Sequence, residues 1–374
     1  MRLFVKETDT FTISKISVLL YDNVEIKPFV DIEEVLPPDY IVISEDDCTI
    51  QAEVMKDYHV IVYEKIIKSI TKNIYDEYQY RHDYYYLLYA LNDAYSANIT
   101  TLISGSSYGA LGIDSIELKN SVNLSSISQD LYYSVELIKK VCDKNLNIQN
   151  IIICAMYYFL FCDLSLTQNM DELQRISKVY YPLLGDMHNC FFCPPALDIK
   201  IDSEYIDIDN ILLKFFYDDY KKGFVSDDRP RADYACKLWE DQSKDWHGLT
   251  EYERREACRL RAESHNSNIK DSHLATLREN INILQDLTYY CADRGINLVM
   301  VVPPVSKDYL SFLEPGFKEC FYKTLEDLDG IVHVVDMSED PDFDDVTDMN
   351  DMDHLGDSGA IKFTKKINEL IQSI

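Results

Sequence analysis

From about residue 99 onward, five short and nearly continuous apolar runs alternate with stretches of helical periodicity. A parallel strand covered on both faces is apolar along its length, and parallel strands need crossover connections, usually helices. The pattern predicts an α/β fold, with a parallel five-stranded sheet flanked by helices in a three-layer, flavodoxin-like arrangement. The predicted strands cover residues 101–104, 121–124, 151–156, 296–302 and 331–335.

Three helices follow from apolar stripes at helical spacing. We expect the first to begin at Ser128, a residue type favoured at the N-cap, and to bury residues 131, 135, 138 and 142. The second ends at Gly295, because glycine suits a left-handed C-terminal cap. The third follows His354. The expected buried stripes of the last two helices are Leu274, Leu277, Ile281, Leu284, Leu287 and Cys291, and Ala360, Phe363, Ile367 and Leu370.

The chain is long for one domain, so two domains are predicted. Residues 1–75 read as a small Rossmann-like α/β unit, with strands over residues 16–21, 40–43 and 58–63. No Gly-rich phosphate loop occurs there, so a structural or partner-binding role is favoured over nucleotide binding. Residues 76–374 form the main domain, interrupted by a helical insertion over about 164–265. The insertion is interpreted as packing decoration, with a lid or cleft wall as the alternative.

The charge of the chain restricts its partners. Its formal net charge of −29 disfavours binding to nucleic acid or to anionic membrane surfaces. The ten cysteines show no framework spacing, which favours reduced thiols in a cytosol. No apolar run has the length of a membrane span, and the N-terminus lacks a signal-peptide core. The sequence therefore predicts a cytoplasmic protein without a membrane span, and it leaves the oligomeric state open.

The run after the first predicted strand carries the clearest chemical signal. Gly105-Ser106-Ser107-Tyr108-Gly109 sets a serine on a tight turn between a strand and a helix, which is how α/β folds expose a nucleophile. A serine hydroxyl needs a base to take its proton, and the base is usually a histidine oriented by a carboxylate. Asp351 lies three residues before His354, a spacing that lets its carboxylate reach the imidazole. We therefore predict a Ser107, His354 and Asp351 catalytic set.

The string also fits the G-x-S-x-G elbow of α/β-hydrolases, but its position on the first strand and the shared Asp–His loop argue against that fold. Both features resemble the SGNH (GDSL-type) hydrolase superfamily over residues 95–374. Ser107 matches the nucleophile of its Gly-Asp-Ser-Leu block, where Ser106 replaces the aspartate, and Asp351-Met352-Asp353-His354 matches its Asp-x-x-His block. The following Leu355–Ala360 and the run Val301–Lys307 resemble a branch associated with acyl modification of bacterial surface polysaccharides and the cell envelope.

The resemblance implies a serine esterase or O-acyltransferase that needs no cofactor. Its substrate would be a small-molecule or carbohydrate acyl ester, such as an O-acetylated carbohydrate. The family takes its oxyanion donors from the nucleophile, a glycine after the second strand and an asparagine after the third. Ser125 and Tyr157 stand near the last two positions and are the candidates. Because the glycine and asparagine are missing, the alternative is a weak or inactive scaffold that binds a glycan or a biosynthetic partner.

Further residues are candidates for supporting roles. Asp353 is expected to support the site or to be solvated. No metal is predicted. Four carboxylates follow the spacing of a calcium-binding loop, but the loop lacks the required glycine and the final glutamate. One close pair of cysteines could form half of a zinc site, but no second pair has the spacing to complete it. The carboxylates are Asp340, Asp342, Asp344 and Asp351, the cysteines are Cys190 and Cys193, and the substrate-binding candidates are Tyr108, Asn123, His265 and Asn266.

Overall fold

The computed structural model describes residues 2–6, 25–31, 34–35, 40–43, 59–62, 83–114, 117–191, 246–267 and 273–372. The chain divides into two compact units, and the boundary along the first part of the sequence lies between residues 82 and 83. No helix in these ranges has both the length and the apolar character needed to cross a membrane.

The N-terminal unit contains a four-stranded parallel sheet in the order β2-β1-β3-β4. Its strands are β1 (Arg2–Lys6), β2 (Glu25–Phe29), β3 (Tyr40–Ile43) and β4 (His59–Val62). The two predicted strands at 40–43 and 58–63 are confirmed, whereas the one at 16–21 lies outside the described residues. The sequence did not reveal β1 and β2. Pro28 interrupts the apolar pattern of β2 and is tolerated because β2 is an edge strand.

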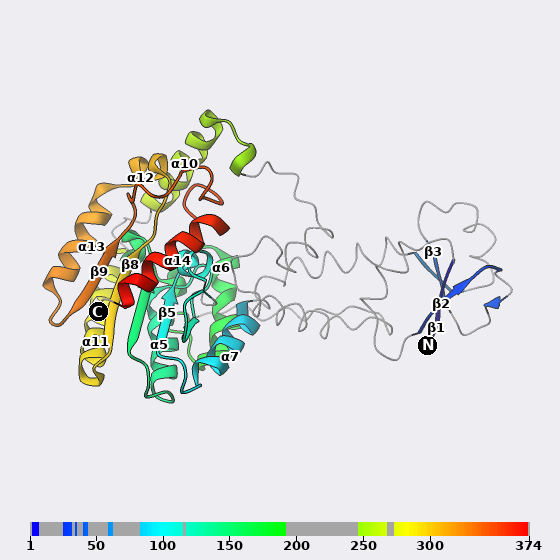
Figure 1. Ribbon diagram of the computed structural model, residues 1–374, viewed down its shortest axis with the longest axis horizontal. Helices are drawn as coiled ribbons and strands as arrows, with labels where there is room; N and C mark the ends of the chain where they lie inside the picture. The colour runs from blue at the N-terminus through cyan, green and yellow to red at the C-terminus, as the bar shows by residue number, and fades with distance from the viewer. Residues whose placement is uncertain are drawn as a thin grey trace. The chain divides into compact units, whose positions relative to one another are not determined.

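The second unit is built on the predicted five-stranded parallel sheet, which is confirmed (Figure 1). Its order is β6-β5-β7-β8-β9. The chain runs from β5 to β6 on one side and then returns to β7 on the other, so the strand order reverses beside β5. Ligands of open α/β sheets bind at such a point, beyond the carboxyl ends of the strands. The strands are β5 (Thr101–Gly105), β6 (Ser121–Asn123), β7 (Asn150–Cys154), β8 (Asn297–Val302) and β9 (Val332–Asp336).

Helices cover both faces of this sheet. Helices α4 (Ser107–Gly112) and α14 (Asp357–Ile371) contact each other, and α4 packs on β5 and β7. Helices α5 (Leu131–Cys142) and α11 (His273–Arg294) contact each other on β5 and β8. The crossover from β5 to β6 carries α4, and the crossover from β6 to β7 carries α5 and runs across the sheet in the opposite direction. Right-handed crossovers therefore put α4 and α5 on opposite faces. The remaining helices near the sheet are η2 (Tyr157–Phe161), α12 (Lys307–Phe312) and α13 (Pro315–Asp327).

Most of the predicted helix features hold. Gly295 follows α11 with a φ of 65°, the left-handed cap expected there. The stripe of α14 is buried at residues 360, 363 and 367, and that of α11 at residues 284, 287 and 291. Leu274 is exposed instead, because the first turns of α11 bury Thr276 and Asn280, and Asn280 donates to the Leu160 carbonyl of η2. The cap of α5 was also wrongly predicted: Asp130, not Ser128, accepts the Tyr133 N–H at 2.9 Å.

The insertion begins directly after η2 with four short elements and continues, past residue 245, with η6 and α10. Helix α10 begins at Glu251, where Thr250 and Glu253 form a capping box that fixes its first turn. The insertion is tied to the helix over residues 83–94 by a buried ion pair between Arg175 and Asp83. The elements are η3 (Leu164–Leu166), α6 (Met170–Arg175), the π-helix η4 (Ile176–Tyr180), α7 (Tyr181–Leu184), η6 (Trp246–Gly248) and α10 (Glu251–Asn266).

Candidate active site

The turn after β5 presents Ser107 at the start of α4. Gly105 has a φ of 143°, and a Cβ atom there would lie 2.1 Å from the carbonyl oxygen of Cys154, so only glycine fits this close approach. Ser106 is the N-cap, and Ser107 is the first helical residue. The first N–H groups of a helix have no intrahelical acceptor and carry partial positive charge. Ser107 therefore stands where backbone donors are available to a developing negative charge.

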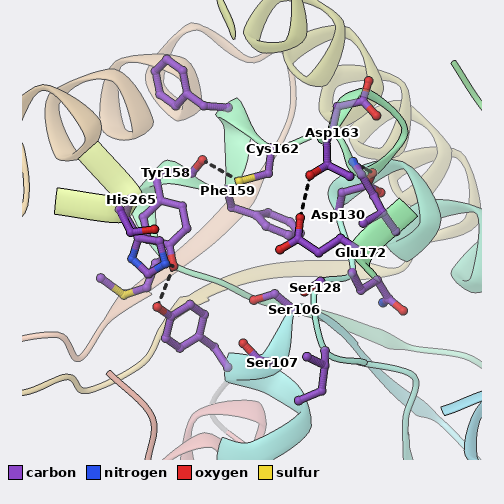
Figure 2. A pocket seen from close by; sticks show the side chains of 18 of the residues that line it. Ser106, Ser107, Ser128, Asp130, Tyr158, Phe159, Cys162, Asp163, Glu172 and His265 are labelled. Atoms are coloured by element: carbon purple, nitrogen blue, oxygen red, sulfur yellow. Dashed lines mark hydrogen bonds between the residues drawn. The ribbon is translucent and has the colours of Figure 1, made fainter. Parts of the chain in front are cut away.

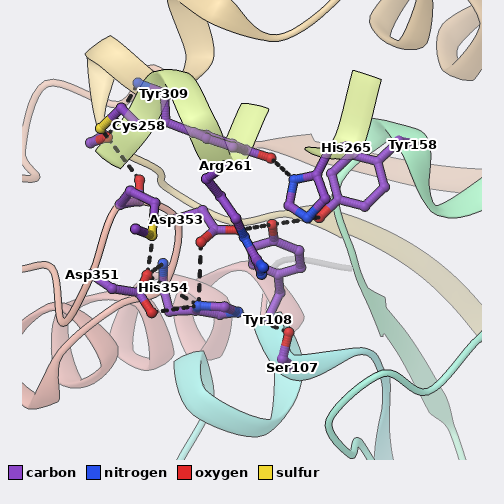
Figure 3. Close-up of polar contacts among 12 residues, drawn as sticks. Ser107, Tyr108, Tyr158, Cys258, Arg261, His265, Tyr309, Asp351, Asp353 and His354 are labelled. Carbon is purple, nitrogen blue, oxygen red and sulfur yellow. Dashed lines mark hydrogen bonds and ion pairs between the residues drawn. The ribbon is translucent and has the colours of Figure 1, made fainter. Parts of the chain in front are cut away.

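A short loop before α14 brings the other two predicted catalytic residues to this serine. His354 Nε2 lies 2.8 Å from Ser107 Oγ, and His354 Nδ1 lies 2.9 Å from Asp351 Oδ2 (Figure 3). Asp351 Oδ1 accepts the backbone N–H groups of Asp353 and His354 at 2.9 and 2.8 Å, which fixes the carboxylate. Because Nδ1 donates to Asp351, Nε2 is free to accept the serine proton. The structure thus brings all three predicted residues together.

The charges in the loop tune this acid–base pair. Burial alone would raise the pKa of Asp351, but hydrogen bonds from His354 and from backbone N–H groups lower it to about 2. Burial opposes protonation of His354, yet the hydrogen bond and charge of Asp351, helped by Asp353, raise the pKa of His354 above its usual 6.5. Asp351 thus stays ionised at neutral pH, and its charge favours the protonated, imidazolium form of His354.

The raised pKa of His354 predicts an acid limb in the reactivity of Ser107. The base must be neutral to accept a proton, so the rate should fall as the pH drops through a pKa above 6.5. Asp351→Asn removes the negative charge and should move this limb to lower pH, with a lower plateau. The rate of modification of Ser107 by a fluorophosphonate, followed across pH, measures both. A limb that does not move in Asp351→Asn would contradict the assignment to His354.

Asp353 is buried under the same loop and is not solvated. Its Oδ2 accepts from the Tyr108 hydroxyl at 2.7 Å and pairs with Arg261 Nε at 3.1 Å. Its Oδ1 lies 3.5 Å from His354 Nδ1 and has no hydrogen-bond donor among the described residues. The Tyr108 ring stacks on the His354 ring with centroids 5.0 Å apart. Tyr108 and Asp353 therefore hold the His354 ring in place. Tyr108, predicted to bind substrate, both contacts His354 and lines the cavity.

His265 joins a second set of buried hydroxyl groups. Its Nδ1 lies 2.6 Å from the Tyr309 hydroxyl and its Nε2 lies 3.3 Å from the Tyr158 hydroxyl, which in turn contacts the Tyr108 hydroxyl at 2.7 Å (Figure 3). Burial, with the nearby charge of Arg261, lowers the pKa of His265 to about 3. The ring is therefore neutral and lines the cavity without acting as a charged group.

Sequence reasoning missed Arg261, Tyr158 and Tyr309 as members of the site. Arg261 lies four residues before His265 on α10, a spacing that sets both side chains on one face of a helix. That spacing could have identified Arg261. Nothing in the sequence alone reveals the two tyrosines, because their hydroxyl groups meet His265 only through tertiary packing.

The two predicted oxyanion donors are engaged elsewhere. The backbone N–H of Ser125 donates to Asn123 Oδ1 at 3.0 Å. The Tyr157 hydroxyl donates to Asp336 and contacts the Ser338 hydroxyl at 2.8 Å. Neither residue lines the cavity around Ser107. The structure therefore does not bring Ser125 or Tyr157 to Ser107 as oxyanion donors, because Asn123, two residues from Ser125, and Asp336, on β9, already bind the two groups.

Two of the predicted substrate-binding residues hold the scaffold instead. Asn123 Nδ2 donates to the carbonyl oxygens of Gly109 and Ile113 at 2.8 and 2.9 Å, which ties α4 to β6. Asn266 donates to the Phe312 carbonyl and accepts the Glu314 N–H. Each side chain bridges two backbone segments, and neither residue is among those that line the cavity around Ser107. The structure therefore does not bring Asn123 and Asn266, predicted to bind substrate, to the candidate site.

A cavity of about 470 Å³ opens beside Ser107 and His354. Figure 2 shows Tyr158 and His265 on one side of it and the acidic residues Asp130, Asp163 and Glu172 on the other. Burial raises the pKa of Asp130 to about 7, although N–H groups of Tyr133 and Leu164 oppose the shift. Residues of η3, α6 and α10 line the cavity, so the described part of the insertion forms a cleft wall and is not mere packing decoration.

The four carboxylates at calcium-loop spacing do not converge. Asp340 and Asp342 both pair with Lys366, at 2.8 and 2.6 Å. Asp344 accepts N–H groups of its own loop, and Asp351 binds His354. Of the cysteine pair, Cys190 is buried and Cys193 lies outside the described residues.

The arrangement provides a hydroxyl, a hydrogen-bonded base and an ionised carboxylate at the end of β5, open to a cavity. This is the chemical equipment for nucleophilic attack on an acyl carbon, with proton transfer to a leaving oxygen. No protein-family model matches the sequence, and a search of curated proteins finds no match.

Proposed function

We propose that the protein is a serine esterase or O-acyltransferase of the SGNH type. The observation that carries the proposal is the continuous chain of contacts from Ser107 Oγ through His354 to Asp351, at 2.8 and 2.9 Å. A structural role for these residues has no need of a buried imidazole with one nitrogen on a carboxylate and the other on a serine. The parallel sheet with the serine after its first strand is consistent with the resemblance in sequence.

In this mechanism Ser107 Oγ attacks the carbonyl carbon of an ester while His354 Nε2 accepts the serine proton. The tetrahedral intermediate collapses, the ester C–O bond breaks, and the imidazolium returns the proton to the leaving alcohol. Water or the hydroxyl of an acceptor then attacks the acyl-serine, with His354 again as the base. Attack by water makes the protein an esterase, whereas attack by an acceptor hydroxyl makes it an acyltransferase.

The cavity supports a small acyl ester as substrate. Its volume of about 470 Å³ is in the usual range for small-molecule sites. Tyr158, Phe159 and Phe161 line it and offer aromatic faces on which a sugar ring could stack. An O-acetylated carbohydrate therefore remains the proposed substrate class, on the strength of the resemblance and these rings.

A second candidate function is a catalytically weak scaffold that binds a glycan or a biosynthetic partner. It is favoured by one observation: Ser125 and Tyr157, which would have replaced the missing oxyanion donors, are bonded to other groups. Loss of one such donor typically slows acyl transfer by about 100- to 1,000-fold. The N–H groups at the start of α4 remain as donors in either case.

Labelling with a fluorophosphonate probe separates the two candidates. An activated serine should react to a stoichiometry of one, and peptide mapping by mass spectrometry should locate the adduct on Ser107. Heat-denatured protein serves as the first control, and the neighbouring substitution Ser106→Ala, whose hydroxyl makes no capping bond, serves as the second. If the native protein stays unlabelled with excess probe at a pH where His354 is neutral, the scaffold is the better description.

A further inference from the structure

A second group of metal-ligating side chains lies outside the triad. It consists of Asp163, His188 and Glu279, called here the acidic-histidine cluster. Asp163 precedes η3, His188 lies in the loop after α7, and Glu279 projects from α11. His188 Nε2 lies 3.7 Å from Asp163 Oδ2 and 3.8 Å from Glu279 Oε1. Three separate segments of the chain thus bring one nitrogen and two oxygen ligands to a common point.

The cluster has acceptors but no cationic partner. Within the described ranges, neither carboxylate pairs with a lysine or an arginine. The point where the three groups converge is occupied by the Asn189 Nδ2 atom, 3.1 Å from Asp163 Oδ2, 3.1 Å from His188 Nε2 and 3.0 Å from Glu279 Oε2. An amide nitrogen has only two protons for these three acceptors. A cation at this point would satisfy all of them at once.

The spacing and the donor types suit zinc. Zinc binds imidazole nitrogen and carboxylate oxygen at about 2.0–2.2 Å, so neighbouring ligands in a tetrahedral site lie roughly 3.3–3.5 Å apart. The observed ligand separations of 3.7 and 3.8 Å are a few tenths of an ångström wider than this, so a zinc site needs a small inward movement of the ligands together with displacement of the Asn189 nitrogen from between them. A mixed set of imidazole and carboxylate favours zinc over calcium or magnesium, which take oxygen ligands.

The ligands are held by neighbours outside the cluster. The Tyr132 ring stacks on the His188 ring, with centroids 3.7 Å apart and planes 16° apart. The Asp186 carboxylate accepts the backbone N–H of His188 at 3.2 Å and also accepts the Tyr132 hydroxyl. Asp163 Oδ1 accepts the Ser165 N–H, which leaves Oδ2 for the cluster. Such outer contacts orient metal ligands before the metal arrives.

We propose that the acidic-histidine cluster is a zinc site. Asp163, His188 and Glu279 supply three ligands. The Asn189 side chain, whose nitrogen fills the point between them, withdraws to admit the ion and turns its amide to offer the oxygen as a fourth ligand. Asp163 also lines the cavity beside Asp130 and Glu172 (Figure 2). Zinc would therefore join the cavity wall to α11 and to the loop after α7. The site is independent of the proposed acyl chemistry, because no triad residue belongs to it.

Zinc binding by the full chain, freed of metal with a chelator, tests the proposal. Equilibrium dialysis with elemental analysis should give a zinc ion at this site in the wild type. His188→Ala and Glu279→Gln should each weaken zinc binding by more than about tenfold, because even mutation of a residue that only orients a metal ligand lowers metal affinity by about 10- to 100-fold. Asn189→Asp adds a charged fourth ligand and should tighten binding. Circular dichroism checks that each variant is folded.

Two controls separate this site from other zinc binding. His247→Ala removes an exposed histidine outside the cluster and should leave the affinity unchanged. Asp351, Asp353 and His354 also bring ligand atoms together, so His354→Ala should remove any ion bound there and keep the ion at the acidic-histidine cluster. Wild-type protein that binds no zinc overturns the proposal. So does retention of wild-type affinity in both folded variants, His188→Ala and Glu279→Gln.

Discussion

Replacing Ser107 with alanine is expected to lower kcat for hydrolysis of a short acyl ester by about a millionfold, the size of effect found when a serine nucleophile is removed. The physical reason is that no other hydroxyl among the described residues is bonded to His354 Nε2, so the base has no proton to take. Steady-state kinetics with a chromogenic acyl ester measure the loss. The variant should fold normally, because the Ser107 side chain is not part of the buried core.

The matched control is Ser106→Ala, one residue away in the same turn. The Ser106 hydroxyl is buried without a hydrogen-bond partner in the described part of the chain, so its removal should change turnover by no more than a few fold. Turnover by Ser107→Ala within tenfold of the wild type would show that another residue is the nucleophile. Equal losses in the two variants would point to damage of the turn instead of loss of the reacting group.

The second large effect is expected for Asp351→Asn, at about 10⁴-fold in kcat. Asp351 fixes the tautomer of His354 by accepting from Nδ1 at 2.9 Å. An amide in its place can donate to Nδ1, which leaves the proton on Nε2, and a protonated Nε2 cannot accept the proton of Ser107. The comparison is Asp353→Asn. The Asp353 carboxylate lies 3.5 Å from the same Nδ1 and is neutralised by Arg261.

Asp353→Asn should therefore cost much less in kcat than Asp351→Asn. It removes the partner of Arg261, so its main effect should be on stability. Because the Arg261 side chain is 39% exposed, solvent screening should keep this loss below the roughly 3 kcal/mol expected for a fully buried ion pair. Thermal unfolding measured beside the kinetics separates the two losses. A larger loss of kcat in Asp353→Asn than in Asp351→Asn would transfer the orienting role to Asp353.

The sequence predicted the sheet and the triad because both depend on local patterns. Continuous apolar runs indicate strands that are buried on both faces. Asp351 and His354 lie three residues apart, so their side chains can reach each other in a tight loop. Ser107 was singled out because a glycine-flanked serine between a strand and a helix stands where α/β folds expose a nucleophile. These patterns can be recognised in the sequence without knowledge of the tertiary structure.

The surroundings of the triad could not be predicted in the same way. Ser125 and Tyr157 stood at the expected positions, but Asn123, two residues before Ser125, and Asp336, on β9, bind their polar groups. Likewise, Asp353 became a buried partner of Arg261 only when α10 packed beside the loop. The edge strand β2 was missed because an edge tolerates a proline that an inner strand does not. Apart from the local bond to Asn123, these errors concern the placement of segments that are distant in the sequence.

The loop that carries the acid and the base also implies an order of assembly. The hydrogen bond between Asp351 and His354 spans three positions in the chain, whereas that between His354 and Ser107 spans 247. The first pair can form whenever the loop closes, because local contacts cost little chain entropy. The second requires β5 and α14 to be in their native positions. Chemical reactivity of the serine would thus arise only in the final folded state, so a partly folded chain would carry a formed acid–base pair but no activated nucleophile.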